Sequence, residues 1–174
     1  MFADPTKILR AFGLEENMIV ADLGAGTGFY SIAASRMVPS GKVYAVEVQK
    51  DFLTTIRNKI AEEHLNNIEC ILGDIERIGG TKIKDKVADA AIASNVLFQL
   101  EDKEKFIEEV KRILKPGGRL LLIDWSDKSA AFPIGFNKVV PKEKAREMFE
   151  GKGFISERDI PAGEHHYGII FKNK

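Results

Sequence analysis

The stretch that decides the fold is Asp22-Leu-Gly-Ala-Gly-Thr-Gly28, which directly follows the apolar run Met18-Ile-Val-Ala. Glycines at this spacing let the chain turn sharply between a strand and a helix, and they let a ligand approach the backbone closely. The dinucleotide fingerprint G-x-G-x-x-G would need a third glycine at position 29, where this chain has Phe29, and the P-loop pattern is also missing. The stretch therefore predicts a ligand-binding loop of another kind, and a tight turn without a ligand is the alternative.

Apolar runs and helical patterns alternate on both sides of this loop. Strands are expected at 43–48, 68–72, 88–93 and 120–125, and helices at 29–38, around 53–60, after Asp102 and after Pro141. Such alternation predicts an α/β fold in which a mostly parallel sheet is covered by helices on both faces. Only a few residues join the last two strands, 154–160 and 166–171, so these should pair as an antiparallel hairpin.

Length and composition limit the kind of protein. A chain of 174 residues fits one domain over residues 1–174, and 44% apolar with 30% charged residues is typical of a globular protein. Its 26 basic and 26 acidic residues balance, so no overall attraction to nucleic acid or membrane is expected. No apolar run approaches the ~18 residues of a membrane span, and no signal peptide is expected, which predicts a cytoplasmic location. The one cysteine, Cys70, excludes a disulfide framework and fits a small core residue.

Two acidic residues follow strands at the edge where open parallel sheets bind ligands. Glu47 ends the second strand 23 residues after Gly24, and an acid there can accept hydrogen bonds from both hydroxyls of a ribose. Asp74 follows the third strand, where its carboxylate can accept a hydrogen bond from an adenine amine. The alternatives are a solvated glutamate and an aspartate that makes an Asx turn or caps a helix.

Four segments in order carry a resemblance to a known family: ADLGAGTGFYS, VYAVEV, LGDI and LKPGGRLLLIDW. With them, nearly the whole chain resembles the class I S-adenosylmethionine-dependent methyltransferases. It is most similar to small single-domain members of the group that includes ubiquinone/menaquinone-type and arsenite methyltransferases. The resemblance implies a Rossmann-like three-layer sandwich with a seven-stranded sheet in the order 3-2-1-4-5-7-6 and an antiparallel strand 7.

The resemblance also implies S-adenosyl-L-methionine as the cofactor. It places the loop glycines against the cofactor, Glu47 on the ribose, Asp74 and Ile75 beside the adenine, and Ser94 near the methionine end. The residues expected to contact the cofactor are Asp22, Leu23, Gly24, Ala25, Gly26, Thr27, Gly28, Tyr30, Glu47, Val48, Asp74, Ile75, Ser94 and Asn95.

Departures from subfamily patterns favour a small-molecule acceptor. Residues 94–97 read Ser-Asn-Val-Leu, unlike the N-P-P-Y motif of nucleic-acid amino-methyltransferases, and the several cysteines of arsenite methyltransferases are absent. No aromatic residues are interleaved with the lysines at 82, 84 and 86, which disfavours nucleic-acid binding. About a dozen residues precede the first strand, so no large recognition cap is expected. The segment 126–140 is the candidate substrate wall; its candidate apolar lining, which could equally pack onto the domain, is Phe132, Ile134 and Phe136.

His166 is the candidate general base, because a neutral histidine with a pKa near 6.5 can accept a proton from a hydroxyl or amine acceptor. It shares a strand face with Gly168, whose missing side chain would leave room for a ligand, whereas His165 shares its face with apolar residues. The alternative is a strand-end histidine without a catalytic role. No metal site is expected, since the three histidines (His64 is the third) lack further ligands at a useful spacing.

The sequence therefore predicts a cytoplasmic S-adenosylmethionine-dependent methyltransferase, monomeric or homodimeric, that acts on a small molecule by in-line methyl transfer. One alternative is methylation of a protein or RNA site, and another is a non-catalytic, cofactor-binding partner subunit. A third, an NAD-dependent oxidoreductase, is disfavoured by Phe29 and the terminal hairpin.

Overall fold

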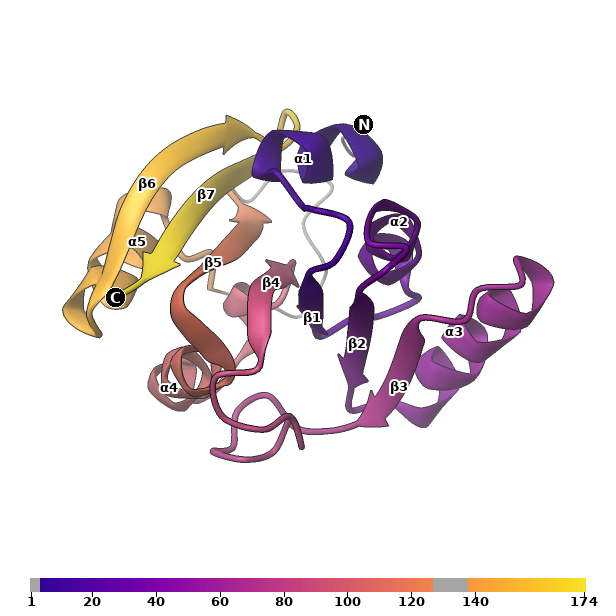
Figure 1. The fold of residues 1–174 in the computed structure, drawn as a ribbon. Helices are drawn as coiled ribbons and strands as arrows, with labels where there is room; N and C mark the ends of the chain where they lie inside the picture. Colours follow the sequence, from indigo (N-terminus) through magenta and orange to yellow (C-terminus); the bar gives the residue numbers. More distant parts are fainter. Residues whose placement is uncertain (1–3, 127–137) are drawn as a thin grey trace.

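The structure, a computed structural model, describes residues 4–126 and 138–174. A single seven-stranded sheet runs through the described part of the molecule, with helices on both faces (Figure 1). The strands are β1 (Ile19–Leu23), β2 (Lys42–Glu47), β3 (Ile68–Leu72), β4 (Ala88–Ser94), β5 (Leu114–Trp125), β6 (Phe154–Pro161) and β7 (His166–Asn173). Their order is β3-β2-β1-β4-β5-β7-β6, and β7 runs antiparallel to both of its neighbours. The predicted fold class, sheet order and terminal hairpin are confirmed.

The helices divide between the two faces of the sheet. They are α1 (Pro5–Phe12), α2 (Phe29–Met37), α3 (Lys50–Glu62), α4 (Lys103–Ile113) and α5 (Lys142–Gly151), with a short 3-10 helix η1 (Leu97–Gln99) after β4. Residues of α1, α2 and α3 pack with one set of strand side chains, and residues of η1, α4 and α5 pack with the other. Because both faces are covered, the central strands read as continuous apolar runs rather than alternating ones.

Helix α1 is an element that the sequence reading did not predict. Asp4 caps it, because its side chain accepts a hydrogen bond from the Thr6 N–H at 2.9 Å, and Pro5 occupies the first turn. Gly13 ends the helix with a φ of +81°. Phe12 is fully buried at the end of the helix, and the Arg119 guanidinium of β5 lies over its ring. The N-terminal segment is thus part of the domain core.

Strand β5 is longer than predicted. The sequence predicts a strand at 120–125, but the strand begins at Leu114. Its pairing with β4 shifts register between Ala88 and Ala90, and Gly117 takes a φ of +78° there. The glycines therefore serve a bulge within the strand rather than a turn before it.

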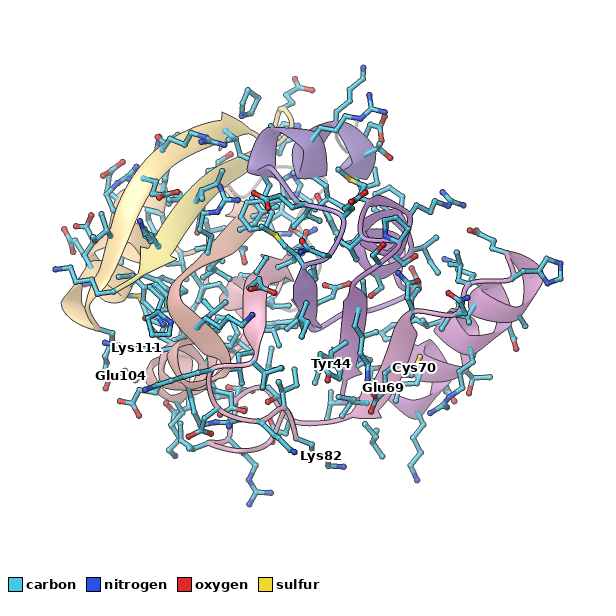
Figure 2. All side chains as sticks on the ribbon, viewed as in Figure 1. Tyr44, Glu69, Cys70, Lys82, Glu104 and Lys111 are labelled. Carbon is cyan, nitrogen blue, oxygen red and sulfur yellow. The ribbon has the colours of Figure 1, made fainter. Side chains whose placement is uncertain are left out.

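The β2–β3 side of the sheet holds Cys70, which is half-buried between β3 and α3. Burial raises the pKa of its thiol. Figure 2 shows Cys70 next to Glu69, with Tyr44 on the neighbouring strand opposite Glu69. Lys42 forms an ion pair with Glu69 at 2.5 Å.

None of the helices in residues 4–126 and 138–174 is long and apolar enough to cross a membrane.

Candidate functional site

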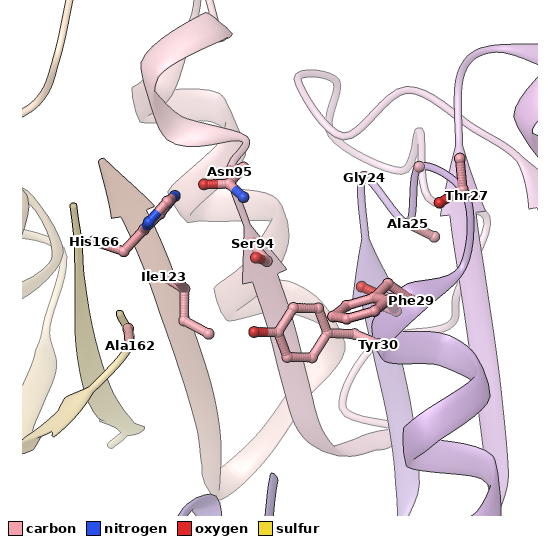
Figure 3. Close-up of a pocket in the computed structure, with 12 residues that line it drawn as sticks. Gly24, Ala25, Thr27, Phe29, Tyr30, Ser94, Asn95, Ile123, Ala162 and His166 are labelled. Carbon is pink, nitrogen blue, oxygen red and sulfur yellow. The ribbon is translucent and has the colours of Figure 1, made fainter. Parts of the chain in front are cut away.

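Two adjoining cavities lie along the carboxyl ends of the parallel strands. The first, here the β2 cavity, has a volume of about 430 Å³ and lies between the ends of β2 and β3 and the start of η1. The second, here the β7 cavity, has a volume of about 330 Å³ and lies between the glycine loop, β4 and the start of β7 (Figure 3). Both are lined by Gly24, Gly26, Ser94 and Asn95. The cavities therefore form one cleft, with the glycine loop and the end of β4 at its middle.

The glycine loop is shaped to leave space in the cleft. Gly24 and Ala25 donate their N–H groups to the Val46 carbonyl at 2.9 and 3.0 Å, which holds the loop over the end of β2. Gly24 has a φ of +74°, and a Cβ there would lie 2.4 Å from Val96 Cγ1. Gly26 has a φ of +53°, and a Cβ there would meet nothing within 4 Å. Gly24 is thus required by packing, whereas Gly26 leaves open space in which a ligand can lie against the backbone.

Glu47 lies at the end of β2, where it lines the β2 cavity with only 6% of its surface exposed. Its carboxylate accepts hydrogen bonds from three backbone N–H groups, those of Gly26, Val48 and Gln49, at 2.8 to 2.9 Å. A buried carboxylate needs such donors to offset its lost hydration. The alternative of a solvated strand-end glutamate is excluded by this burial.

Asp74 and Ile75 also line the β2 cavity. Asp74 Oδ1 accepts a hydrogen bond from the Glu76 N–H at 2.9 Å, which is the Asx turn considered as its alternative role. The turn leaves Oδ2 to accept a further bond, so both roles are compatible. Val48, 63% exposed, adds an apolar side chain to the lining.

A buried acid lies at the side of the β7 cavity nearest the loop. Asp22 accepts a hydrogen bond from Ser31 Oγ at 2.5 Å. Burial raises the pKa of Asp22 to about 6, although the Ser31 bond works in the opposite direction. Beside it, burial raises the pKa of Tyr30 to about 12, opposed by a hydrogen bond with Ser94. A buried carboxylate on a cavity favours a ligand that brings a positive charge.

His166 lines the far side of the β7 cavity together with Ile123 and Ala162. Strand pairing puts it beside Trp125 of β5, with 4.2 Å between the ring centroids. Figure 3 shows His166 and Asn95 pointing toward one another. The sequence predicts that His166, rather than His165, faces the ligand-binding edge.

The prediction that Gly168 leaves room for a ligand beside His166 is wrong. A Cβ on Gly168 would lie 2.8 Å from Ile160 Cγ1 and 2.9 Å from the Ile160 carbonyl oxygen. The missing side chain of Gly168 therefore makes room for the neighbouring strand β6, not for a ligand. His166 reaches the cavity because it begins β7, whose antiparallel direction brings its first residue to the ligand-binding edge.

Sequence reading missed several lining residues. Phe29, at the start of α2, is 53% exposed and lines the β7 cavity, yet it served only to exclude a dinucleotide fingerprint. Its position directly after the glycine loop was the available signal. Phe52, Gln99 and Leu100 line the β2 cavity and carried no motif. The predicted substrate-wall residues Phe132, Ile134 and Phe136 lie outside the described residues.

Asp124 lies at the same edge but is fully buried on the other face of the sheet. It accepts hydrogen bonds from the N–H groups of Leu97 and Trp125 at 2.7 and 2.8 Å. Burial raises the pKa of Asp124 to about 6. The residue therefore supports the start of η1 behind the cleft.

Within the part of the chain that the structure describes, no three histidine, cysteine or acidic side chains gather as a metal site would require.

Comparison with known proteins adds a family to this geometry. Residues 14–162 match the family described as "Methyltransferase domain". An arsenite methyltransferase of Halobacterium salinarum is 30% identical over 106 residues, which cover 60% of this chain and 26% of that protein. A ubiquinone/menaquinone biosynthesis C-methyltransferase, UbiE, of Hahella chejuensis is 31% identical over 116 residues, 66% of this chain and 45% of that protein. The chain thus spans between a quarter and a half of the length of these relatives.

A solved structure matches over a much larger share of both chains. The crystal structure of a SAM dependent methyltransferase from Aquifex aeolicus superimposes with a TM-score of 0.88 at 30% sequence identity. The match covers 98% of this chain and 90% of that chain. The fold of this chain is therefore shared with that methyltransferase over nearly the whole length of both chains.

Proposed function

This chain belongs to the class I S-adenosylmethionine-dependent methyltransferases, and we propose that it transfers the methyl group of S-adenosyl-L-methionine to a small molecule. The observation that carries the proposal is the continuous cleft, in which the β2 and β7 cavities meet at Gly24, Gly26, Ser94 and Asn95. A methyltransferase must hold a donor and an acceptor end to end. One cleft with a polar half and an apolar half meets that need.

The β2 cavity suits the nucleoside part of the cofactor. Glu47 can accept a ribose hydroxyl, Asp74 can accept a hydrogen bond from the adenine amine, and Ile75 and Val48 offer apolar surface to the ring. The open space at Gly26 lets the cofactor lie against the loop. These features support the proposal that the residues present bind the cofactor that the family uses.

The middle of the cleft suits the methionine part. Asp22 is a buried acid on the β7 cavity, and an ammonium group beside it would lower its raised pKa. Tyr30 and Ser94 line the cavity beside it. When bound, the cofactor supplies a sulfonium methyl group that a nucleophile displaces in line.

The rest of the β7 cavity is proposed to hold the acceptor. Phe29, Ile123 and Ala162 form apolar walls, which favour an acceptor with a ring or an aliphatic body. His166 is the one imidazole on this cavity among the described residues, so it is proposed to accept the proton that an acceptor hydroxyl or amine loses. The walls orient the acceptor and exclude water, which supplies the larger part of the rate.

Titration calorimetry with S-adenosylmethionine, S-adenosylhomocysteine and NAD tests the cofactor. We expect the first two to bind and NAD not to bind; tighter binding of NAD would overturn the proposal. Incubation of the protein with methyl-labelled cofactor and separate metabolite, protein and RNA fractions then tests the acceptor. We expect label in the metabolite fraction. Label in protein or RNA would favour a macromolecular acceptor, and no transfer to any fraction would favour a non-catalytic, cofactor-binding subunit.

We further propose a cytoplasmic location and a monomeric or homodimeric state. The single, half-buried cysteine, with no second cysteine to form a disulfide within the chain, supports a reducing compartment. Cell fractionation and light scattering of the purified protein test these two points.

A further inference from the structure

Trp125 and His166 lie opposite each other on paired strands. Trp125 ends β5, His166 begins β7, and the antiparallel register matches the two residues. Side chains that are directly opposite in an antiparallel pair point to the same face of the sheet. The two ring centroids are 4.2 Å apart, with 40° between the ring planes. The indole is therefore in direct contact with the imidazole.

Hydrogen bonds fix the backbone around this pair. Asp124 Oδ1 accepts from the Trp125 N–H at 2.8 Å, and Asp124 Oδ2 accepts from the Leu97 N–H at 2.7 Å. Just beyond the two strand ends, the His165 carbonyl accepts from the Ser126 N–H at 2.8 Å. Trp125 is only 4% exposed, so close packing holds its ring in place. An indole fixed in this way limits the orientations that are open to the imidazole.

Contact with an indole also changes the relative energy of the two protonation states of an imidazole. The face of an indole attracts a cation that lies within about 6 Å of its centroid. A neutral imidazole lacks the charge that gives this attraction. His166 lines the β7 cavity (Figure 3), whereas Trp125 is not among the described residues that line it. The indole can therefore act on an acceptor in this cavity only through His166.

We propose that Trp125 is a positioning residue for His166, which holds the imidazole at the β7 cavity and stabilises the protonated ring that forms when His166 accepts a proton. The inference rests on the proposed function, because it takes His166 as the base. In that step the acceptor oxygen or nitrogen forms a bond to the methyl carbon, and the sulfonium sulfur keeps the electron pair of the broken bond. The proton of the acceptor passes to a ring nitrogen of His166.

Charged and titratable groups on neighbouring elements also act on His166. Those on the described residues are Asp22 of β1 and Tyr30 of α2, which share the cavity, Asp124 of β5, Tyr167 of β7, and Glu164 and His165 before β7. None of these groups is altered when Trp125 alone is replaced. A comparison of Trp125 variants therefore isolates the contribution of the indole.

The fluorescence of Trp125 tests the contact directly, because Trp125 is the only tryptophan in the chain. A protonated imidazole in contact with an excited indole quenches its fluorescence, whereas a neutral imidazole does so far less. We expect the fluorescence of the wild type to fall as the pH is lowered through the titration of His166, and we expect His166→Gln to lose this transition. His64→Gln, at an exposed position just after α3, is the matched control and should keep it.

Absence of the transition in the wild type, or a transition of undiminished size in His166→Gln, would overturn the inference. Because His166→Gln leaves the buried indole in place, this test does not depend on the stability of a Trp125 variant.

An NMR titration of the His166 ring protons measures the electrostatic effect of the indole. Trp125→Phe keeps an aromatic face, whereas Trp125→Leu keeps only apolar packing. The midpoint of the titration should lie about 0.4 to 0.7 of a pH unit lower in Trp125→Leu than in the wild type, and Trp125→Phe should lie between the two. Equal midpoints in all three proteins, or a higher midpoint in Trp125→Leu, would contradict the proposal.

Calorimetry with S-adenosylhomocysteine separates this inference from the proposed function. Failure of the wild type to bind S-adenosylhomocysteine would refute the proposed function. Binding together with equal midpoints would refute only the role of Trp125.

Discussion

Replacement of Glu109 by glutamine should destabilise this protein by about 3 kcal/mol at pH 7. Glu109 is fully buried on α4, and its carboxylate accepts hydrogen bonds from Arg112, from both the hydroxyl and the N–H of Thr81, and from the Gly79 N–H. Burial alone would raise the pKa of Glu109, but these bonds outweigh burial and lower it to about 2. An ordinary glutamate has a pKa of about 4.3, and one pKa unit corresponds to about 1.36 kcal/mol, which gives the magnitude.

The lowered pKa also sets the pH dependence. The contribution of Glu109 is complete above the unfolded-state pKa of about 4.3 and is lost as the pH falls through the folded-state pKa of about 2. About half of it has gone by pH 3. The difference in free energy of unfolding between wild type and Glu109→Gln should therefore fall from about 3 kcal/mol at pH 7 to about 1.5 kcal/mol at pH 3, measured by urea unfolding.

A matched control is the neighbouring, exposed Glu108, which pairs with Lys152 at 2.9 Å. Glu108→Gln should change the free energy of unfolding by less than about 0.5 kcal/mol, because exposed ion pairs contribute little. A loss below about 1 kcal/mol for Glu109→Gln at pH 7, or a loss that does not depend on pH, would refute the reasoning. Since Gly80 between the two bonded amides accepts a hydrogen bond from the Asp74 N–H at 3.1 Å, the variant should also bind S-adenosylhomocysteine more weakly.

Further predictions concern the cleft itself. Gly26→Ala should abolish calorimetric binding of S-adenosylhomocysteine, because its Cβ would enter the open space beside the loop. It should also lower the free energy of unfolding by about 1–2 kcal/mol, because residue 26 has a φ of +53°. Retained binding would show that the cofactor does not lie there. Gly24→Ala should unfold at clearly lower urea, since its Cβ would collide with Val96, and an unchanged midpoint would contradict this. Because burial raises the pKa of Asp22 to about 6, the wild type should lose stability as the pH rises from about 4 through about 6. In urea unfolding, Asp22→Asn should remove this part of the loss, and the variant should also bind the cofactor more weakly. Equal pH dependence of the free energy of unfolding in the two proteins would argue against this prediction. With an identified acceptor, His166→Ala should lower turnover by about 10²-fold at constant cofactor affinity, and normal turnover would mean that catalysis rests on positioning alone.

Features that depend on neighbouring residues could be predicted from the sequence. The glycine loop, the strands around it and the short connection between β6 and β7 are local patterns, and they led to the α/β class and the antiparallel last strand. Helix α1 was overlooked, although Asp4, Pro5 and Gly13 are local signals for its two ends. The information that specifies this helix is therefore local to residues 4–13.

Features that depend on contacts between distant residues could not be predicted. Gly168 looked like space for a ligand, because nothing in the sequence shows that Ile160 of the adjacent strand fills it. Glu109 likewise has no local signal for its burial, since the amides that it binds lie 28 and 30 residues earlier in the chain.

The sequence by itself determined the fold class, the family resemblance and several of the residues that line the β2 cavity. The tertiary structure alone decided which hydrogen bonds those residues make. Glu47 is at a predictable strand end, but only the folded loop brings the Gly26 N–H to within 2.8 Å of its carboxylate. Periodicity and turn chemistry are encoded over a few residues, whereas the direction and number of hydrogen bonds at a buried carboxylate follow from how separate segments pack.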